Sequence, residues 1–574
     1  MSEHLYPCPN TRAIENESEV GRYTMSVPPL VSVKPRSVDT YLRYDLEEKK
    51  LFMKLFVLTI ILTIPAVLYA NAASCESLAT IALPYVTITG AEPRPAGEFT
   101  STGAKPLTAL PALCRVVGSI KPSPDSDIRF EVWLPASGWN GKFQGIGNGG
   151  YAGAIGFAGL ADAVRNGYAA ASTDTGHQDG GTSAAWALNH PEKIVDFGYR
   201  AIHETAVVAK DIIRAFYGQQ PRRSYFNSCS NGGRQALMEA QRYPADYDGI
   251  IAGAPANNWT HLLSAAASGV RATLAEPASY IPASKLQALQ AAALAQCDSA
   301  DGVNDGVIEN PLTCHFDPAS LQCKDSETDS CLTVAQITAL KSIYNGLKSN
   351  NGRLIFPGLS PGGENEPGGW APWVAGAEPG KSLMYSFSTQ FFKNMVYSNP
   401  DWQFQTFDSD RDVKTADQRM ARQLNATNPD LSAFQKRGGK LILYHGWTDA
   451  AIPAVNAVNY FDSVVTKMGA STSSAFLRLY MVPGMEHCGG GAGPNAFGQG
   501  GTPDGDRFHS IDAALEAWVE QGIAPDQLIA TKYKTNFNPR SGTVRTRPLC
   551  AWPQTAKYKG SGSTDDAANF SCGK

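Results

Sequence analysis

Residues 223–237 have the sequence Arg-Ser-Tyr-Phe-Asn-Ser-Cys-Ser-Asn-Gly-Gly-Arg-Gln-Ala-Leu. The first half favours a β-strand that ends at Ser228, and the residues after Gly232-Gly233 permit a helix. Ser230 is therefore expected at a tight strand-to-helix corner. In the Gly-x-Ser-x-Gly form of such a corner, the residues two before and two after the serine are small, because the turn brings the backbones close together. Ser228 and Gly232 meet this condition, so we predict a nucleophile elbow, although serine and glycine clusters more often form plain turns.

Strands and helices are expected to alternate on both sides of this corner. The apolar patterns predict strands at 128–134, 142–147, 167–172, 249–253, 440–444 and 477–482. They predict helices at 196–217, 453–468 and 511–521, of which the first and last end at Gly218 and Gly522. Strands that alternate with helices favour an α/β fold with a parallel sheet covered on both faces.

Residues 257–427 interrupt this alternation with four cysteines, many glycines and prolines, and an aromatic cluster. We interpret them as an inserted domain between a first core part, 73–256, and a second core part, 428–574. The aromatic residues of the cluster are Trp370, Trp373, Tyr385, Phe387, Phe391, Phe392, Tyr397, Trp402, Phe404 and Phe407.

The amino-terminal region has the pattern of an export signal. Residues 1–52 are polar without a sustained period, which indicates a disordered or untranslated extension. Residues 53–72 begin with Met-Lys, continue with an apolar run and end in Ala-Asn-Ala, as in a secretory signal peptide. The run contains Pro65 and is shorter than the roughly 20 residues of a spanning helix. We therefore expect a secreted or periplasmic protein without a membrane span after cleavage. The alternative is a signal anchor that keeps the extension in the cytosol.

Composition limits the partners and the compartment. The 574 residues are 43% hydrophobic and 18% charged, which suits a large globular core. A net charge of -4 argues against nucleic-acid binding, so we expect small-molecule partners. Ten of the 11 cysteines lie beyond residue 72, and this even number predicts a disulfide framework in an oxidising environment.

A serine nucleophile needs a histidine to take its proton and a carboxylate to orient that histidine. In α/β-hydrolases the chain order is serine, acid, histidine. Asp449 follows the strand at 440–444, and His487 lies five residues beyond the strand at 477–482. We predict that Ser230, Asp449 and His487 meet at the carboxyl edge of the sheet, where ligands of such sheets bind. Asp449 alone would more simply be a helix-capping turn residue, and His509 is expected to be solvated or capping.

Residues next to this predicted triad suggest its supports. Cys229 precedes the serine and Cys488 follows the histidine, so a disulfide between them would hold nucleophile and base within reach. The Asn231 N–H is a predicted oxyanion donor, and the second is the N–H of Gly149 or Gly150. The glycine-rich loop that carries these glycines lacks the spacing of a phosphate-binding loop.

A second candidate site is a loop between two cysteines. Residues 298–308 contain Asp298, Asp301 and Asp305 with two glycines, which would let oxygen ligands converge on a hard cation such as Ca²⁺. The spacing differs from that of an EF-hand. A series of surface turns is the alternative.

Three motifs resemble those of a known family: Cys-Ser-x-Gly-Gly-Arg-Gln at 229–235, Gly-Trp-x-Asp-x-x-Ile-Pro at 446–453, and His-Cys at 487–488. They resemble the tannase and feruloyl esterase family, which includes mono(hydroxyethyl)terephthalate hydrolase. The resemblance extends to 173–177 and 200–204 and so covers nearly the whole predicted mature chain. Relatives often have glycine where this chain has Ser228.

The resemblance implies an α/β-hydrolase core with a lid domain at 257–427. It implies the catalytic triad named above, the Cys229–Cys488 clamp, and Ca²⁺ bound in the lid. The implied calcium ligands are the side chains of Asp298, Asp301 and Asp305 and the carbonyls of Val303 and Val307. The other implied disulfides are Cys75–Cys114, Cys297–Cys314, Cys323–Cys331 and Cys550–Cys572.

We therefore expect a secreted serine carboxylesterase that hydrolyses small-molecule esters of aromatic acids, such as hydroxycinnamates or gallate. Some lid aromatic residues would stack on the acyl ring, whereas most would fill the core of the lid. Two alternatives stay open. One is another acyl-transfer enzyme of this fold, such as a peptidase or an esterase for aliphatic, polyester or terephthalate-monoester substrates. The other is a calcium-stabilised binding protein without catalysis.

Overall fold

The computed structural model describes residues 73–101, 105–499 and 506–574. The predicted extension at 1–52 and the predicted signal peptide at 53–72 lie outside these ranges. Within the ranges, no helix has the length and apolar character needed to cross a bilayer.

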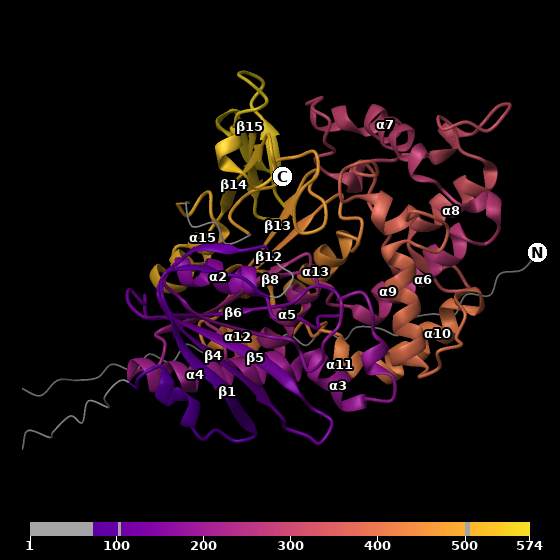
Figure 1. Ribbon diagram of the computed structural model, residues 1–574. Coiled ribbons are helices and arrows are strands. Elements are labelled where there is room, and N and C mark those ends of the chain that lie inside the picture. The colour runs from indigo at the N-terminus through magenta and orange to yellow at the C-terminus, as the bar shows by residue number, and fades with distance from the viewer. Residues whose placement is uncertain (1–72, 102–104, 500–505) are drawn as a thin grey trace, which may run out of the picture. The chain divides into compact units, whose positions relative to one another are not determined.

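A mixed sheet of nine strands forms the centre of this part of the chain (Figure 1). Its spatial order is β1-β4-β5-β7-β6-β8-β9-β12-β13. The strands are β1 (Val86–Arg94), β4 (Leu113–Ile120), β5 (Ile128–Pro135), β6 (Lys142–Ile146), β7 (Ala169–Thr173), β8 (Arg223–Cys229), β9 (Gly249–Gly253), β12 (Lys440–Gly446) and β13 (Leu477–Val482). All six strands predicted from apolar patterns are therefore present, and so is the strand predicted before Ser230, which is β8.

The prediction of a parallel sheet is right for the strands from β7 to β13 and wrong for the strands from β1 to β7. The pairs from β7 to β13 are parallel. At the other edge, β1, β4, β5 and β7 pair antiparallel. Only residues 121–127 connect β4 to β5, which is too short for the crossover that parallel neighbours need.

Helices cover both faces of the sheet. Helices α4 (Ala201–Tyr217), α5 (Asn231–Arg242) and α13 (Val455–Met468) pack on one face, in the largest apolar cluster. Helices α2 (Phe157–Arg165) and α15 (Ile511–Gln521) pack on the other. As predicted, α4 and α15 end at glycines in the left-handed conformation, Gly218 at φ 73° and Gly522 at φ 74°. The predicted helix at 196–217 begins with one π-helical segment, Asp196–Arg200.

Residues 257–427 add no strand to the nine-stranded sheet. They form mainly helices, drawn magenta to orange in Figure 1, and their two ends meet where the Ala426 N–H donates to the Asn257 carbonyl at 2.7 Å. Most of the predicted aromatic cluster is buried within this segment. Its main elements are α6 (Trp259–Thr273), α7 (Leu286–Cys297), α8 (Val334–Asn345), β10 (Leu347–Lys348), β11 (Leu354–Phe356), α9 (Leu383–Gln390) and α10 (Ser409–Ala416).

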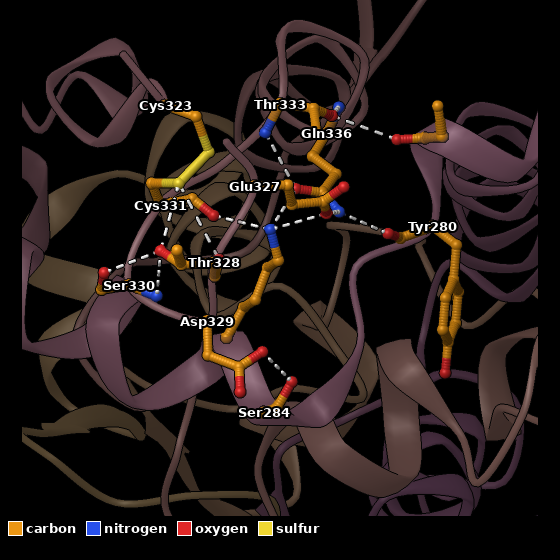
Figure 2. Close-up of polar contacts among 12 residues, drawn as sticks. Tyr280, Ser284, Cys323, Glu327, Thr328, Asp329, Ser330, Cys331, Thr333 and Gln336 are labelled. Carbon is orange, nitrogen blue, oxygen red and sulfur yellow. Dashed lines mark hydrogen bonds and ion pairs between the residues drawn. A yellow bond between two sulfur atoms is a disulfide. The ribbon is translucent and has the colours of Figure 1, made fainter. Parts of the chain in front are cut away.

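A buried lysine, Lys285, stabilises one corner of this segment. Figure 2 shows the residues of this corner around Glu327, Gln336 and the disulfide between Cys323 and Cys331. The Lys285 ammonium donates to the Cys331 carbonyl at 2.6 Å and to Gln336 Oε1 at 3.0 Å, and it pairs with Glu327 at 2.8 Å. Thr333 and Gln336 form a capping box at the start of α8. The Cys323–Cys331 disulfide closes the loop beside them, so this corner is cross-linked by polar and covalent bonds.

The carboxyl-terminal residues form two hairpins that sequence periodicity did not predict. They comprise β14 (Gln527–Tyr533) with β15 (Thr543–Cys550), and β16 (Thr555–Tyr558) with β17 (Phe570–Gly573). A bridge between Tyr480 and Ala551 joins them to β13.

The described cysteines form five disulfides, which join the same pairs that the family resemblance implies. Two of them, Cys297–Cys314 and Cys323–Cys331, lie within residues 257–427. The pair Cys75–Cys114 fastens the amino-terminal residues to β4, and Cys550–Cys572 joins β15 to β17.

Candidate active site

Ser230 occupies a strained corner between β8 and α5. Its backbone has φ 67° and ψ -125°, a conformation that L-residues rarely adopt. The Ser230 N–H donates to the Gly253 carbonyl at 2.9 Å. A Cβ atom on Gly232 would lie 1.9 Å from the Ser228 hydroxyl oxygen, so only glycine fits two residues after Ser230. Ser228 itself fits two residues before it, and the corner has the shape expected of a nucleophile elbow.

The structure brings Ser230, His487 and Asp449 into one hydrogen-bonded line. Ser230 Oγ lies 2.9 Å from His487 Nε2, and His487 Nδ1 lies 2.8 Å from Asp449 Oδ2. A carboxylate can only accept hydrogen bonds, so the proton of neutral His487 lies on Nδ1. Nε2 is then free to accept the hydroxyl proton of Ser230, which is the protonation state that a general base requires.

Asp449 is buried and fully hydrogen-bonded. Its Oδ1 accepts the N–H groups of Ala451 at 2.8 Å and Ile452 at 2.9 Å, and its Oδ2 also lies 3.1 Å from His445 Nε2. Burial alone would raise the pKa of Asp449, but the neighbouring His487 charge and the histidine hydrogen bonds hold it well below its usual range. Asp449 therefore stays ionised whenever His487 needs a counter-charge. His445 did not emerge from the sequence reasoning, although it lies four residues before Asp449.

A disulfide joins the two neighbours of the nucleophile and the histidine. Cys229 and Cys488 have an S–S distance of 2.00 Å and Cα atoms 6.0 Å apart. The bond links the end of β8 to the loop after β13, which carries His487. By contrast, His509 is exposed and lies 3.0 Å from Asp506, as expected for a residue outside the site.

The glycine-rich loop after β6 is fastened to the helix that follows Ser230. The Asn148 N–H donates to Gln235 Oε1 at 2.9 Å, and Gln235 Nε2 donates to Asn148 Oδ1 at 3.1 Å. The Asn148 carbonyl lies 3.2 Å from where a Cβ atom on Gly232 would be. This pairing keeps Gly149 close to Asn231, the first residue of α5, and the two N–H groups remain the predicted oxyanion donors.

Aromatic residues from the 257–427 segment line the triad. The Trp373 ring meets the His487 ring edge to face, with centroids 5.5 Å apart. Trp373 stacks on Phe387 at 5.9 Å, and Phe387 stacks on Tyr151 at 5.3 Å. The Tyr151 hydroxyl donates to the Phe387 carbonyl at 2.7 Å, which attaches this aromatic wall to the glycine-rich loop. Trp373 and Phe387 keep part of their surface exposed and could contact a ring bound next to Ser230.

The predicted calcium loop is folded around Asp298. One oxygen of Asp298 accepts the Asp305 N–H at 3.1 Å, and the other accepts the Gly306 N–H at 2.8 Å. Asp301 Oδ1 accepts the Val303 N–H at 3.0 Å. These bonds bend the loop so that Asp301 and Asp305 face one small cavity, which Asp298 and Val303 do not line.

Glu309, which the sequence reasoning missed, also lines that cavity, together with Val307 and Arg547. Burial raises the pKa values of Asp301 and Asp305, and it raises that of Glu309 to about 8. Buried carboxylates that face one another suit a divalent cation with oxygen ligands. Arg547 lies 2.5 Å from Asp305 and offsets part of this negative charge. Arg545 also pairs with Asp305 at 3.1 Å, so the cavity offers oxygen donors of the type that Ca²⁺ prefers, but two arginines already compensate the Asp305 charge.

The fold and the elbow define the chain as an α/β-hydrolase, and comparisons with known proteins agree. The crystal structure of feruloyl esterase B from Aspergillus oryzae matches with a TM-score of 0.80 at 30% identity, over 87% of this chain and 99% of that one. The tannin acyl hydrolase of Aspergillus niger matches with a TM-score of 0.70 at 25% identity, over 88% and 96% of the two chains.

Sequence relatives give the same result. An uncharacterized esterase of Xanthomonas campestris pv. campestris is 43% identical over 87% of this chain and 91% of its own length. The probable feruloyl esterase B-2 of Aspergillus flavus is 38% identical over 76% of this chain and 83% of its own length. The family model of tannase and feruloyl esterase matches residues 114–573. The chain belongs to the tannase and feruloyl esterase family and is a carboxylic ester hydrolase.

Proposed function

We propose that this protein is a secreted serine esterase that hydrolyses esters of aromatic acids, such as feruloyl or galloyl esters, through an acyl-enzyme. The observation that carries the proposal is the line of hydrogen bonds from Ser230 Oγ to His487 Nε2 at 2.9 Å and from His487 Nδ1 to Asp449 at 2.8 Å. An unactivated serine hydroxyl is a poor nucleophile, and this arrangement is the one that activates it.

In the proposed reaction, His487 Nε2 takes the hydroxyl proton of Ser230 while Oγ attacks the ester carbonyl carbon. Asp449 stabilises the imidazolium that forms, and the N–H groups of Asn231 and Gly149 stabilise the negative oxygen of the tetrahedral intermediate. His487 then gives the proton to the leaving alcohol as the C–O bond breaks. Water repeats the sequence on the acyl-enzyme, so that the acid leaves and Ser230 regains its proton.

The aromatic acyl group is proposed from the wall beside the triad. Trp373 lies against His487, and Phe387 continues the wall toward Tyr151. Ring stacking of this kind contributes about 0.5–1.5 kcal/mol for each aromatic pair beyond the burial of area. Two relatives of known structure, a feruloyl esterase and a tannin acyl hydrolase, support the same substrate class.

Secretion and calcium are part of the proposal. Five disulfides suit an oxidising compartment and support export by the predicted signal peptide. Asp301, Asp305, Glu309 and the Val307 carbonyl would hold Ca²⁺, with Asp298 shaping the loop. The ion would hold the carboxylates of this loop together, and the ion pair between Asp305 and Arg547 of β15 joins the loop to the carboxyl-terminal hairpins.

A comparison of esters tests the substrate class. Rates of hydrolysis of methyl ferulate, methyl gallate, a terephthalate monoester and an aliphatic ester of the same alcohol would be measured side by side. We expect kcat/KM to be about tenfold or more higher for a feruloyl or galloyl ester than for the aliphatic ester, given the stacking energy above. A preference for the terephthalate monoester would favour the alternative of an esterase for terephthalate monoesters. Equal rates on all four esters would contradict specificity for aromatic acids.

A further inference from the structure

A second histidine contacts the carboxylate of the triad. His445 lies near the end of β12 and is fully buried, with no exposed surface. Its Nε2 atom is 3.1 Å from Asp449 Oδ2 and 3.0 Å from the Ile452 carbonyl oxygen. The imidazole thus connects the catalytic carboxylate with the far end of the turn that carries it.

The contacts of His445 define its protonation state. Nε2 lies within hydrogen-bond distance of two acceptors, so it carries a proton. Nδ1 is buried and has no hydrogen-bond partner among the described residues. A second proton there would place an unpaired N–H and a positive charge in the core, which is costly. His445 is therefore a neutral donor and not a second general base.

Asp449 Oδ2 consequently accepts from two imidazoles: from the His487 Nδ1–H, and from the His445 Nε2–H, which it shares with the Ile452 carbonyl oxygen. We infer that His445 is a positioning residue of the triad, which holds the Asp449 carboxylate in place and withdraws part of its negative charge from His487. The inference rests on the proposed serine mechanism and deepens it. His445 would set how strongly Asp449 stabilises the His487 imidazolium and, through it, the pH range in which the enzyme works.

Few other charged groups face this pair. Glu486 approaches Asp449 from the loop after β13, and both of its oxygens are buried without partners. Burial and the Asp449 charge raise the pKa of Glu486 well above its usual range. Glu364, next to it, is buried and bonded to Tyr344, and burial raises its pKa as well. Glu366 is the remaining carboxylate near Glu486. Among these titratable groups, only the two histidines hydrogen-bond directly to Asp449, beside the backbone N–H groups of Ala451 and Ile452.

The test is the pH profile of kcat/KM for wild type and His445→Leu. Loss of the Nε2 donor leaves more negative charge on Asp449, which then holds the His487 imidazolium more tightly. His487 would gain its proton at a higher pH, so the acid limb of the profile should move up by about one pH unit. The loss of orientation should also lower kcat by about tenfold or more, with little change in KM.

Two further variants separate positioning from packing. His445→Gln keeps an amide donor near the Nε2 position and should restore the acid limb and most of kcat. Leu443→Ala removes packing two residues earlier on the same face of β12, so it should lower the melting temperature without moving the acid limb. Should the leucine variant fail to fold, His445→Asn, whose amide is too short to reach Asp449, provides the same comparison.

If the acid limb of the kcat/KM profile stays in place in His445→Leu or His445→Asn, the inference is wrong. It is also wrong if kcat falls equally in His445→Leu and His445→Gln. Ser230→Ala distinguishes this result from a failure of the proposed mechanism. If Ser230→Ala is inactive while His445→Leu keeps the wild-type profile, only the role of His445 is wrong. If Ser230→Ala retains activity, the serine mechanism itself is wrong.

Discussion

Ser230 Oγ and His487 Nε2 lie 2.9 Å apart although 257 residues separate the two side chains in the sequence. The residues directly beside them, Cys229 and Cys488, are joined by a disulfide. The side chains of Ser230 and His487 are thus held relative to each other by a covalent bond between their neighbours in the sequence. Small errors in such distances lower rates strongly, so this bond should matter more for activity than for stability.

We predict that the double variant Cys229→Ser/Cys488→Ser remains folded but loses about 100-fold or more of its kcat/KM, because the hydrogen bond between Ser230 and His487 becomes loose. Circular dichroism and ester hydrolysis on the same samples measure both effects. Cys323→Ser/Cys331→Ser removes a disulfide that closes a loop of eight residues and is the matched control, with activity close to wild type. A fully active clamp variant would refute the prediction.

Trp373 should contribute to acyl specificity. Trp373→Ala removes the ring that meets His487, so kcat/KM for an aromatic-acid ester should fall by about tenfold, whereas that for an acetyl ester of the same alcohol should change little. Trp402→Phe is the control, because Trp402 is buried against Phe392 and should affect stability alone. Equal losses on both esters in Trp373→Ala would show that the ring only supports the fold.

Asp174 should make the fold less stable toward neutral and alkaline pH. Its Oδ1 accepts the N–H groups of Arg129 and Gly176, its Oδ2 is buried without a partner, and burial raises its pKa to about 7. Its pKa in the unfolded chain is about 3.9, so the stability that the protonated form contributes is fully present below that pH. This stability is lost as the pH rises through about 7.

Asp174→Asn keeps the acceptor oxygen and cannot ionise. From about pH 5 to pH 8 the free energy of unfolding should decrease in both proteins. The decrease should be smaller in Asp174→Asn than in wild type, by about 1–3 kcal/mol. Urea denaturation at the two pH values measures the difference. Parallel losses in both proteins would mean that Asp174 ionises freely in the folded state.

Removal of calcium should lower thermal stability without directly removing a catalytic group. A ligand at 100 times its Kd stabilises the folded state by about 2.7 kcal/mol, so a chelator should lower the melting temperature of wild type measurably. Asp301→Asn retains the acceptor for the Val303 N–H but loses the charge, and the chelator should then have little effect. If the melting temperature of wild type is the same with chelator and with added calcium, the cation site is refuted.

The parts of the fold with strong periodicity were predictable. The six strands predicted from apolar patterns were found because each is an apolar run bounded by polar residues or glycine. The helix ends at Gly218 and Gly522 were predicted because glycine readily adopts the left-handed conformation that both residues have. The antiparallel edge formed by β1 and β4 and the carboxyl-terminal hairpins were missed. In β1 and β15 exposed and buried residues do not alternate regularly.

At the site, motif order led to Ser230, Asp449 and His487, because each follows a strand and chain order limits the choices. His445 and Glu309 could not be found in this way. His445 belongs to an apolar strand and resembles any buried residue there, and its role depends on the angle at which the Asp449 turn folds back. Glu309 is held beside the predicted calcium loop by the carboxyl-terminal hairpin: its carboxylate accepts a hydrogen bond from the Ala556 N–H at 3.0 Å.

Covalent labelling tests most directly whether Ser230 is the nucleophile. Wild type would be treated with a fluorophosphonate, and the intact mass and the modified peptide would be measured together with residual esterase activity. We expect one adduct per chain, on Ser230, with activity lost in proportion, and neither adduct nor activity in Ser230→Ala. Labelling at another residue, or full esterase activity in Ser230→Ala, would contradict it.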